Sequence, residues 1–309
     1  MQTPVIVIDW GSTNCRASLV IDGQVADRRS AEIGITRMAG RDYAAEFAAL
    51  VDPWKDRTRD CVIFGMVTSR SGWLETPYAE CPAKLDDLIP LAVTRTIAGM
   101  RAIFVPGVCH RTPHCDVIRG EELQAFGLVA TGTPDAVVLL PGTHSKWLVL
   151  SGGRIDHFST APTGELFSLL SRHSLVGAIA DQATFDLPAF ERGAERALGS
   201  STDLFDLFEA RPRVLLGQMT PQEVTGHLSG LLIGAESRQA RTRFGGDMSD
   251  IVIIGEGTLV SKYHKVLEIA GLSARMPDAD LGLSGALDFW SAWRAASETH
   301  VLAAKSDAE

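Results

Sequence analysis

VIVIDWGSTN, residues 5–14, runs from an apolar stretch through an acidic residue into a turn of glycine, serine and threonine. An altered copy, VVLLPGTHS, occupies residues 137–145. In each copy an apolar strand, a tight turn and a returning strand follow one another. The returning strands cover residues 16–20 and 146–150, and corresponding positions in them are 130 residues apart. The repeat predicts one architectural unit that occurs twice.

Both turns suit phosphate. Backbone N–H groups and hydroxyls in such turns converge on phosphate oxygens, and a cation on the returning strand adds positive charge. A single Gly-Ser-Thr turn is usually an ordinary hairpin, so the prediction depends on the duplication. Two such turns that face each other would clamp the phosphates of a nucleotide. The residues expected to bind these phosphates are Gly11, Ser12, Thr13 and Arg16 in the first copy and Gly142, Thr143, His144 and Lys146 in the second.

Asp9 ends the apolar strand of the first copy, where the chain leaves the predicted sheet. A hydrated Mg²⁺ commonly bridges such a carboxylate to phosphates. The second copy has Pro141 at the corresponding place. The sequence therefore predicts one metal position, at Asp9.

Composition sets the class of protein. The 309 residues are enough for two domains of about 150 residues each. A hydrophobic content of 45% and a charged content of 22% are typical of soluble globular proteins, and no apolar run approaches the roughly 18 residues that span a bilayer. The N-terminus does not resemble a secretory signal. We therefore expect a cytoplasmic protein without a membrane partner.

The net charge of −9 and the absence of a block of Lys and Arg argue against a nucleic-acid partner. The five cysteines are irregularly spaced, which favours free thiols over a disulfide framework. Cys109, His110, His114 and Cys115 offer four possible zinc ligands, but their spacing is not that of a zinc knuckle. We expect a polar loop that enters the next helix instead.

Hydrophobic periodicity predicts a three-stranded meander at residues 4–8, 16–21 and 24–31, followed by strands at 61–65 and 103–106 and helices at 42–51 and 119–130. The second half repeats this scheme, with strands at 136–140, 146–150, 154–160 and 250–254 and a helix at 258–271. A long helical insertion is expected between about residues 163 and 242. Thr131-Gly132-Thr133-Pro134 ends a helix before a new strand, so the predicted domains cover residues 1–132 and 133–309, with a cleft between them.

A further helix is expected to begin at Thr220, with Thr220 as its N-cap and Glu223 completing a capping box. Gly226, Gly230 and Gly234 recur every four residues along it. Close packing against a neighbouring helix is the favoured explanation, and a ligand-facing role is the alternative.

A third turn follows the buried strand at residues 250–254 and leads into a helix. Gly255 and Gly257 let the backbone approach a ligand closely, although Val260 stands where a dinucleotide fingerprint needs a third glycine. Gly255, Gly257 and Thr258 would suit the adenosine side of ATP.

Two carboxylates, Glu121 and Glu122, lie in the first turn of the helix that closes the first half. A favourable interaction with the helix dipole is the structural explanation. The functional explanation places one of them where it accepts a proton from an attacking hydroxyl while ATP supplies the phosphoryl group.

The loop at residues 69–78 mixes hydroxyls, a cation and aromatic rings, which suits a polar, acidic small molecule. A surface loop with two anchoring aromatic residues is the alternative. Residues 34–37, which follow the third strand, would add a second cation to the same pocket. The residues predicted to bind substrate are Gly34, Thr36, Arg37, Ser69, Arg70, Trp73, Tyr78 and Arg119.

The Asp-x-Gly-Ser-Thr turn, the duplication and the third turn together resemble the actin-like ATPase superfamily of sugar kinases, Hsp70 and actin. The phrases IDWGSTN (8–14), GITR (34–37), RGEE (119–122), PGTHSKW (141–147), TGEL (163–166) and SGLLIGAE (229–236) resemble the 2-dehydro-3-deoxygalactonokinase family more narrowly. They occur in order through most of the chain.

The resemblance implies an α/β fold of two duplicated RNase H-like, actin-like domains with an interdomain cleft. It implies a kinase that uses ATP and Mg²⁺ to phosphorylate 2-dehydro-3-deoxy-D-galactonate at its 6-hydroxyl, in D-galactonate breakdown. A homodimer is expected only because the family resemblance implies one.

The resemblance also implies roles for individual residues. Glu121 occupies about the position of the catalytic carboxylate of related sugar kinases, where Asp is more common, and Glu165 is a rival base. Arg37, Arg70 and Arg119 are candidates for the substrate carboxylate. The second phosphate motif of the superfamily usually has Asp where this chain has Pro141, and Lys146 would compensate for that difference.

Two competing functions stay open at this point. One is a phosphohydrolase of the polyphosphate-cleaving kind, which the Gly120-Glu121-Glu122 phrase suggests. The other is a non-enzymatic actin-like module. The sequence leaves the stereochemistry of the sugar acid open as well.

Overall fold

A computed structural model describes residues 3–112, 114–199, 204–245, 248 and 250–306, with side chains up to residue 299. It is an α/β protein with mixed sheets. No helix in these ranges is long and apolar enough to cross a membrane. The chain divides into two compact units. Unit 1 comprises Met1–Asp135, Leu150–His157 and Ala279–Glu309, and unit 2 comprises Ala136–Val149 and Phe158–Asp278.

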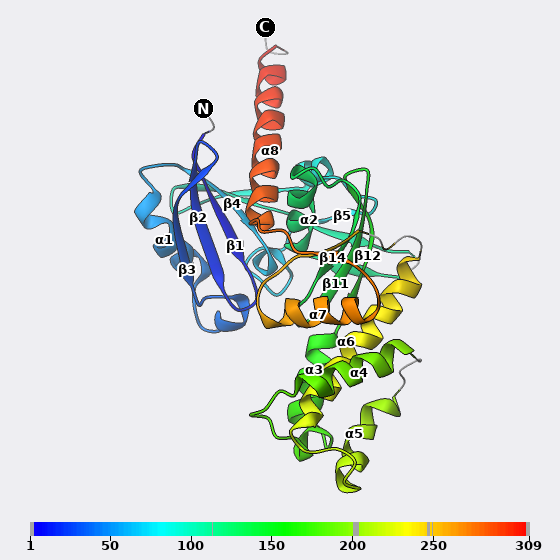
Figure 1. Ribbon diagram of the computed structural model, residues 1–309. Helices are drawn as coiled ribbons and strands as arrows, with labels where there is room; N and C mark the ends of the chain where they lie inside the picture. The colour runs from blue at the N-terminus through cyan, green and yellow to red at the C-terminus, as the bar shows by residue number, and fades with distance from the viewer. Residues whose placement is uncertain (1–2, 113, 200–203, 246–247, 249, 307–309) are drawn as a thin grey trace. The chain divides into compact units, whose positions relative to one another are not determined.

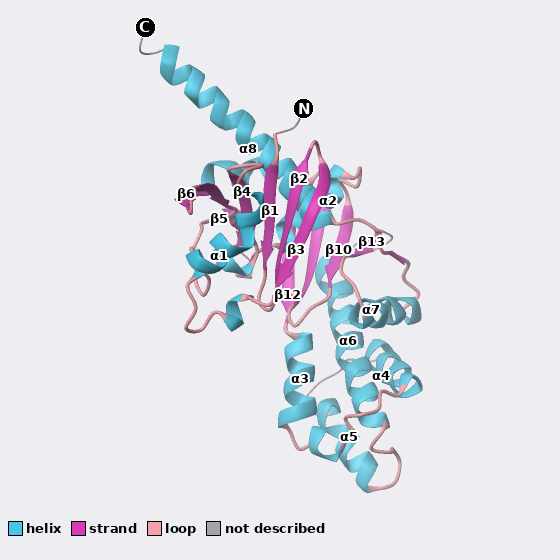
Figure 2. Ribbon diagram, turned by 90° about the vertical axis from the view of Figure 1, so that its left-hand side faces the viewer, coloured by secondary structure: helices cyan, strands magenta, loops and turns pink. Residues whose placement is uncertain are grey.

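The first sheet has six strands, in the order β3 (Gln24–Ala31), β2 (Cys15–Ile21), β1 (Val5–Trp10), β4 (Asp60–Phe64), β7 (Met100–Phe104) and β6 (Val93–Ile97). β1 pairs antiparallel with β2 and parallel with β4, and β4 pairs parallel with β7. β1, β2 and β3 lie side by side in Figure 2, which confirms the predicted meander. The carboxyl ends of β1 and β4 therefore meet at one edge of the sheet.

The second sheet has five strands, in the order β12 (Arg154–Ala161), β11 (Ser145–Ser151), β10 (Ala136–Leu140), β13 (Ile251–Ile253) and β14 (Ala274–Arg275). β10 pairs parallel with β13, and β13 pairs parallel with β14. The strands expected at residues 136–140, 146–150, 154–160 and 250–254 are confirmed within two residues at each end. The central strands read as apolar runs because both of their faces are covered.

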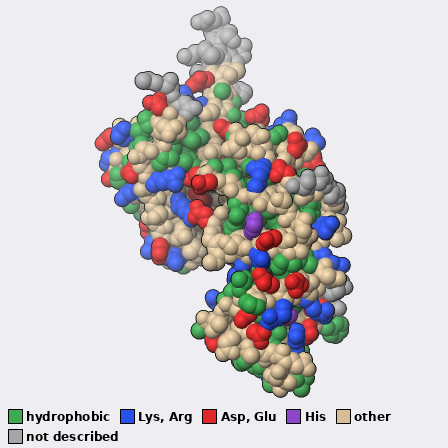
Figure 3. Space-filling model, in the orientation of Figure 1, with side chains coloured by type: hydrophobic (Ala, Val, Ile, Leu, Met, Phe, Trp, Pro, Cys, Tyr) green, Lys and Arg blue, Asp and Glu red, His purple; other side chains and the backbone are tan. Residues whose placement is uncertain are grey.

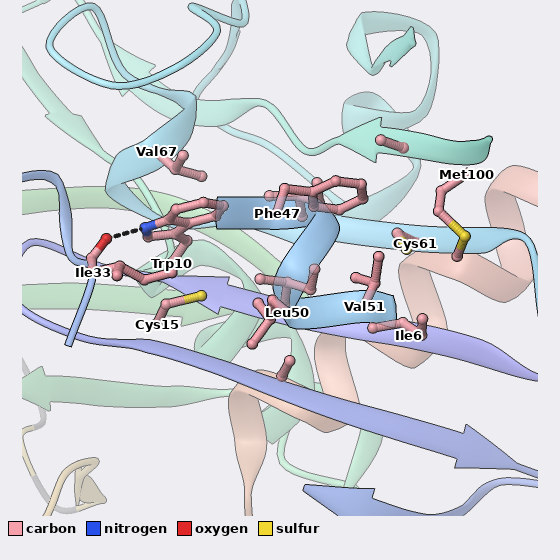
Figure 4. Close-up of a cluster of buried hydrophobic side chains, with 14 of the residues drawn as sticks. Ile6, Trp10, Cys15, Ile33, Phe47, Leu50, Val51, Cys61, Val67 and Met100 are labelled. Carbon is pink, nitrogen blue, oxygen red and sulfur yellow. Dashed lines mark hydrogen bonds between the residues drawn. The ribbon is translucent and has the colours of Figure 1, made fainter. Parts of the chain in front are cut away.

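The core of unit 1 forms around β1, all of whose residues except Asp9 are buried. Trp10, at 0% exposure, donates from its indole Nε1 to the carbonyl oxygen of Ile33 at 2.5 Å (Figure 4). Burying such a ring without a partner for its N–H would be costly. This bond also fixes the chain just before Gly34.

The α-helices that the structure describes in unit 1 are α1 (Tyr43–Val51), α2 (Glu121–Ala130) and α8 (Leu281–Ser306). α2 and α8 pack closely, as Figure 1 shows. A Cβ on Gly127 would lie 2.0 Å from the carbonyl oxygen of Leu281, and one on Gly285 would lie 1.9 Å from that of Leu123. Only glycine allows this contact.

Unit 2 contains α3 (Thr163–His173), α4 (Leu187–Gly199), α5 (Asp206–Leu215), α6 (Glu223–Phe244) and α7 (Thr258–Ile269). α3, α4, α5 and α6 form the predicted helical insertion (Figure 2). A Cβ on Gly230 of α6 would lie 1.9 Å from the carbonyl oxygen of Phe190 in α4, and one on Gly226 would lie 2.2 Å from that of Asp186. The predicted close-packing role of the glycine stripe is confirmed.

A third, small sheet has the order β5 (Tyr78–Glu80), β8 (Gly107–His110) and β9 (Asp116–Ile118). The predicted polar loop that enters a helix is wrong, because residues 111–115 connect two antiparallel strands and α2 begins only at Glu121. All five cysteines are free, as expected. Among the described residues no group of three or more His, Cys, Asp or Glu side chains is placed to hold a metal ion.

The compact units divide at Asp135, and the segment from Ala279 onward belongs to unit 1. One helix start differs from the prediction. α6 begins at Glu223, after the expected N-cap. The Glu223 Oε2 atom still accepts a hydrogen bond from the Thr220 backbone N–H, at 2.8 Å, so half of the capping box is present.

One face of the molecule is mixed in charge. Lys and Arg side chains are interspersed with Asp and Glu side chains over the face drawn in Figure 3. This distribution agrees with the absence of a basic block from the sequence.

Candidate active site

The first turn, residues 11–14, joins β1 to β2 and is closed by a bond from the Gly11 N–H to the Asn14 carbonyl oxygen, at 2.9 Å. In the part of the chain that the structure describes, the N–H groups of Ser12 and Thr13 have no hydrogen-bond partner. Both residues are exposed. Two free N–H groups in one turn are suited to an anion.

Residues 34–36 pack against this turn and form hydrogen bonds with it. The Gly34 N–H donates to the Thr13 carbonyl oxygen at 3.0 Å, and the Thr36 hydroxyl donates to the Ser12 carbonyl oxygen at 2.8 Å. A Cβ on Gly34 would lie 2.2 Å from the Thr13 carbonyl carbon. Gly34 and Thr36, predicted to bind substrate, therefore contact the first turn and fix its shape.

Asp9 lies at the end of β1, half-buried, directly across from Arg16 on β2. Burial raises the pKa of Asp9 to about 6; the charge of Arg16 lowers it, and the charges of Asp280 and Glu121 raise it. Two carboxylates and the cation of Arg16 thus act on Asp9, and Asp280 is itself paired with Arg28 at 3.0 Å. The net effect of these surroundings is to disfavour the charged form of Asp9.

Two glycines allow the backbone to pack closely beside Asp9. Gly65 follows β4 with φ 92°, and a Cβ there would lie 3.2 Å from the Asp9 Oδ1 atom. A Cβ on Gly120, with φ 104°, would lie 3.3 Å from the Gly65 Cα. Both dihedral angles favour glycine. The start of α2 is thereby brought close to the end of β1.

The two carboxylates that begin α2 have different surroundings. Glu121 is half-buried, and its Oε2 atom accepts from the Arg119 backbone N–H at 2.9 Å. Glu122 is 1% exposed, and both of its oxygens accept from the Gly120 N–H at 2.8 Å. Burial, and next the charge of Glu121, raise the pKa of Glu122 to about 8. Of the two, Glu121 is the more exposed.

Arg119 is 6% exposed and is saturated with protein contacts. Its guanidinium donates to the Tyr78 hydroxyl at 3.0 Å, the Thr68 hydroxyl at 3.0 Å and the Thr76 carbonyl oxygen at 2.6 Å. It also lies 4.1 Å from the centroid of the Tyr78 ring. Arg119 and Tyr78 therefore hold the loop at residues 66–78 in place.

Other residues of this loop divide between the core and the surface. Trp73 packs into the aromatic core, stacked on Tyr43 with centroids 5.8 Å apart. Ser69 is 9% exposed, and its hydroxyl has no hydrogen-bond partner among the described residues. Arg70 is exposed and, in the same ranges, has no ion-pair partner. Arg37 pairs with Glu32 at the surface.

The second turn, residues 141–144, joins β10 to β11 in unit 2. The Glu165 N–H donates to the Thr143 carbonyl oxygen at 3.0 Å. A Cβ on Gly164 would lie 2.6 Å from the Gly142 carbonyl oxygen. The N–H groups of Gly142, Thr143 and His144 have no partner in the described ranges. A glycine segment therefore supports this turn as Gly34 supports the first.

His144 and Glu165 form a polar pair at this turn, with the His144 Nε2 atom 2.8 Å from the Glu165 Oε2 atom. Both side chains are about half exposed, at 48% and 51%. Lys146, on β11, is half-buried. The pair leaves one Glu165 oxygen outside this bond.

The third turn follows β13, beside the second. Gly255 and Gly257 have φ values of 145° and 80°, and a Cβ on Gly255 would lie 4.0 Å from the Pro141 Cδ atom. Gly257 is the N-cap of α7, and Thr258 is its first residue. Both are exposed. The N-terminus of a helix and two glycine turns thus meet at one edge of the sheet, an arrangement suited to phosphate.

Sequence reasoning missed three contributors in unit 1. Asp280 acts on Asp9 from a segment far away in the chain, and no local pattern marks it. Gly65 and Gly120 stand out only as isolated glycines after a strand and before a helix. Their positive φ values, and not their spacing in the sequence, indicate that these positions favour glycine.

Comparisons with known proteins agree on one family. The sequence profile of 2-keto-3-deoxy-galactonokinase matches residues 9–287. The 2-dehydro-3-deoxygalactonokinase of Escherichia coli (strain K12) is 36% identical over 273 residues, which cover 88% of this chain and 91% of that protein. A protein of Rhizobium meliloti (strain 1021) assigned as a 2-dehydro-3-deoxygalactonokinase is 35% identical over 297 residues, covering 90% of this chain and 95% of the relative.

Solved structures show the same likeness. A crystal structure of a Sinorhizobium meliloti protein assigned as a 2-dehydro-3-deoxygalactonokinase matches with a TM-score of 0.85 and 31% identity, covering 94% of this chain and 98% of the other. The activator of 2-hydroxyisocaproyl-CoA dehydratase from Clostridium difficile, solved with bound ADPNP, matches with a TM-score of 0.52 and 13% identity over 96% of this chain and 97% of the other. The second match concerns the fold alone.

Proposed function

The chain belongs to the 2-keto-3-deoxy-galactonokinase family, and we propose that it transfers the γ-phosphoryl group of ATP to the 6-hydroxyl of 2-dehydro-3-deoxy-D-galactonate, a step of D-galactonate breakdown. The observation that carries this proposal is the family match over residues 9–287. Two turns with free N–H groups, each supported by a glycine segment, are the local features that suit a nucleotide.

The two units are proposed to be copies of one actin-like, RNase H-like domain. Their sheets have corresponding strand orders, β3-β2-β1-β4-β7 and β12-β11-β10-β13-β14. Gly34 and Gly164, which support the two turns, are 130 residues apart, as are Thr13 and Thr143. The domain boundary after residue 132 and the cleft stay predictions.

ATP is proposed to bind through backbone. Gly11, Ser12 and Thr13 would contact its phosphates from unit 1, and Gly142, Thr143 and His144 from unit 2, with Arg16 and Lys146 adding charge. Gly255, Gly257 and Thr258 would lie beside adenosine. Fixed N–H groups stabilise the charge of a transferring phosphoryl group without reorganisation.

Asp9 fits a hydrated Mg²⁺. Burial, together with the charges of Asp280 and Glu121, raises the pKa of this half-buried carboxylate to about 6 although Arg16 lowers it, so a bound cation would stabilise its charged form. Oxygen ligands suit this ion. When bound, Mg²⁺ would neutralise charge on the phosphates.

Glu121 is proposed as the base. The Glu121 carboxylate would accept the proton of the attacking hydroxyl, and the first turn would orient the phosphoryl group. The Arg119 N–H donates to one Glu121 oxygen at 2.9 Å and so orients this half-buried side chain. Glu165 is the alternative base, with His144 at 2.8 Å as its orienting partner.

Arg70 is the best placed of the three predicted cations for the substrate carboxylate. It is exposed without an ion pair in the described ranges, next to the unpartnered Ser69 hydroxyl. Arg37 pairs with Glu32 and would have to break this ion pair to bind the substrate carboxylate. Arg119 is proposed as a positioning residue, because its guanidinium already holds the loop.

A cytoplasmic location is proposed, because five free thiols suit a reducing compartment that also supplies ATP. The homodimer expected for the family stays a prediction.

The function is tested by ADP release from purified protein with Mg²⁺-ATP. The acceptors are 2-dehydro-3-deoxy-D-galactonate, its gluconate epimer, a plain hexose and none. We expect turnover with the galactonate acid at least about tenfold above the other three. Equal ADP release without acceptor would favour the phosphohydrolase, and no release in any arm would favour the non-enzymatic module.

A further inference from the structure

A buried carboxylate lies behind the second turn of unit 2. Glu236, on α6, is 7% exposed. Its Oε1 atom accepts from the Trp147 indole Nε1 at 2.7 Å, and its Oε2 atom accepts from the Tyr263 hydroxyl at 2.6 Å. A buried carboxylate is costly unless it is hydrogen-bonded. Each oxygen of the buried Glu236 carboxylate therefore has a hydrogen-bond donor.

Two more side chains complete the set of donors. Burial raises the pKa of Glu236, while hydrogen bonds from Thr163, Tyr263, Trp147 and Ser145 lower it. The Ser145 Oγ atom lies 2.6 Å from the Tyr263 oxygen. Tyr263 has one proton and donates it to Glu236, so Ser145 donates to Tyr263. The carboxylate is thus the acceptor on which the whole network converges.

The donors come from the second turn, from the start of α3 that supports it, and from α7, which begins beside the third turn. Ser145 follows the second turn directly as the first residue of β11. Thr163 is the first residue of α3, immediately before Gly164 and Glu165. Tyr263 lies on α7, which begins at Thr258 beside the third turn. α6 contributes no residue to the turns themselves.

The start of α3 and the second turn are in close contact. A Cβ on Gly164 would lie 2.6 Å from the Gly142 carbonyl oxygen, and the Glu165 N–H donates to the Thr143 carbonyl oxygen at 3.0 Å. A shift of the start of α3 would therefore displace the second turn. Such shifts matter, because bound phosphate requires its N–H donors within hydrogen-bond distance.

We propose that Glu236 is a positioning residue for ATP: by accepting hydrogen bonds from Thr163 and Tyr263, and through Tyr263 holding Ser145, it keeps the second turn, the start of α3 and α7 in the arrangement that binds the nucleotide. The proposal rests on the proposed function, because it takes the second and third turns to contact ATP. Glu236 itself touches no reactant.

The test compares Glu236→Gln and Tyr263→Phe with the unaltered protein. The amide of Gln directs an N–H₂ group at a donor, and Phe removes one hydroxyl while it keeps the ring. We expect the KM for ATP to rise about tenfold in both variants, while the KM for the sugar acid stays within about twofold. The dissociation constant of a non-hydrolysable ATP analogue, measured by calorimetry without sugar acid, should rise by the same factor.

Ser237→Ala is the matched control. Ser237 is the next residue of α6, is 1% exposed, and has a hydroxyl without a hydrogen-bond partner among the described residues. Its substitution removes a buried polar group from the same helix without touching the network. We expect its KM for ATP and its affinity for the analogue to be unchanged.

If folded Glu236→Gln and Tyr263→Phe both keep the KM and analogue affinity of the unaltered protein, the proposal is overturned, even if their melting temperatures fall. If Glu236→Gln does not fold, Tyr263→Phe alone decides. An unaltered protein that binds the analogue without turning over any acceptor would contradict the proposed function, and the calorimetric comparison would still test Glu236.

Discussion

Gly34 shows how one residue type shapes a binding turn. A Cβ at this position would lie 2.2 Å from the Thr13 carbonyl carbon and 2.4 Å from the Ser12 carbonyl carbon. These atoms are backbone and cannot rotate away, so the turn itself has to move. The N–H groups of Ser12 and Thr13 would move with it.

We therefore predict that Gly34→Ala lowers the stability of the protein by about 1–3 kcal/mol and raises the KM for ATP about tenfold. Gly199→Ala is the control, because a Cβ on Gly199 meets nothing within 4 Å. Thermal melting and initial rates check both variants. An unchanged KM in Gly34→Ala would separate this glycine from nucleotide binding.

Glu122 makes stability depend on pH. Its folded pKa of about 8 lies above the ordinary glutamate value of 4.5, so the folded state holds a proton that the unfolded chain releases. A raised carboxyl pKa gives stability that is complete below the unfolded pKa and is lost as pH rises through the folded pKa. The stability due to Glu122 should therefore fall between about pH 4.5 and pH 8.

Glu122→Gln stays neutral and keeps an oxygen for the Gly120 N–H. We predict that its melting temperature, relative to the unaltered protein, rises steadily from pH 5 to pH 8. Glu75→Gln, at an exposed site of the same unit, should show no such trend. A melting-temperature difference that is flat across this range would contradict the burial of a protonated Glu122.

At the scale of elements, the loop at residues 66–78 depends on one buried guanidinium. Arg119 reaches Thr68, Thr76 and Tyr78 at once, and a lysine ammonium is a point charge that cannot span these partners. We predict that Arg119→Lys raises the KM for the sugar acid about tenfold and leaves the KM for ATP within about twofold. Steady-state kinetics with each substrate varied check this.

Arg95→Lys is its control, since Arg95 is exposed on β6 and donates to the neighbouring Thr94 carbonyl oxygen. If Arg119→Lys instead raised both KM values equally, the loop would not be specific to the sugar acid.

α4 and α6 pack through glycine, and this contact has its own prediction. A Cβ on Gly230 would lie 1.9 Å from the Phe190 carbonyl oxygen, so the helices have to separate. We predict that Gly230→Ala destabilises the protein by about 1–3 kcal/mol in urea unfolding. Gln239→Ala, exposed on the same helix, should change stability little. Equal stabilities of the two variants would contradict close packing.

How far sequence predicts each element depends on its pattern. β1 and β10 were predictable because both read as apolar runs, and the glycine spacing of α6 indicated a tight helix contact. β6 and β9 were not predicted, because VTRTI and DVI are short and mostly polar or exposed. Trp73 and Arg119 suited a binding loop by residue type. Their inward direction depends on partners distant in sequence, which composition does not reveal.

At the scale of the whole molecule, the repeat and the family phrases in the sequence indicated the class of enzyme. The assignment of α8 to unit 1 was not predictable, because the apolar face of a helix does not identify its partner. The effect of Asp280, which directly precedes α8, on the pKa of Asp9 was not predictable for the same reason. The charge of the site therefore involves a segment that follows unit 2 in the chain.

The central claim is phosphoryl transfer to a sugar-acid hydroxyl, and ³¹P NMR of a complete reaction tests it most directly. Purified protein is incubated with Mg²⁺-ATP and 2-dehydro-3-deoxy-D-galactonate until ATP is consumed. We predict that ADP and one phosphate monoester, coupled to the two protons at C6, form in equal amounts. Inorganic phosphate as the main product, with the sugar acid unchanged, would contradict the account.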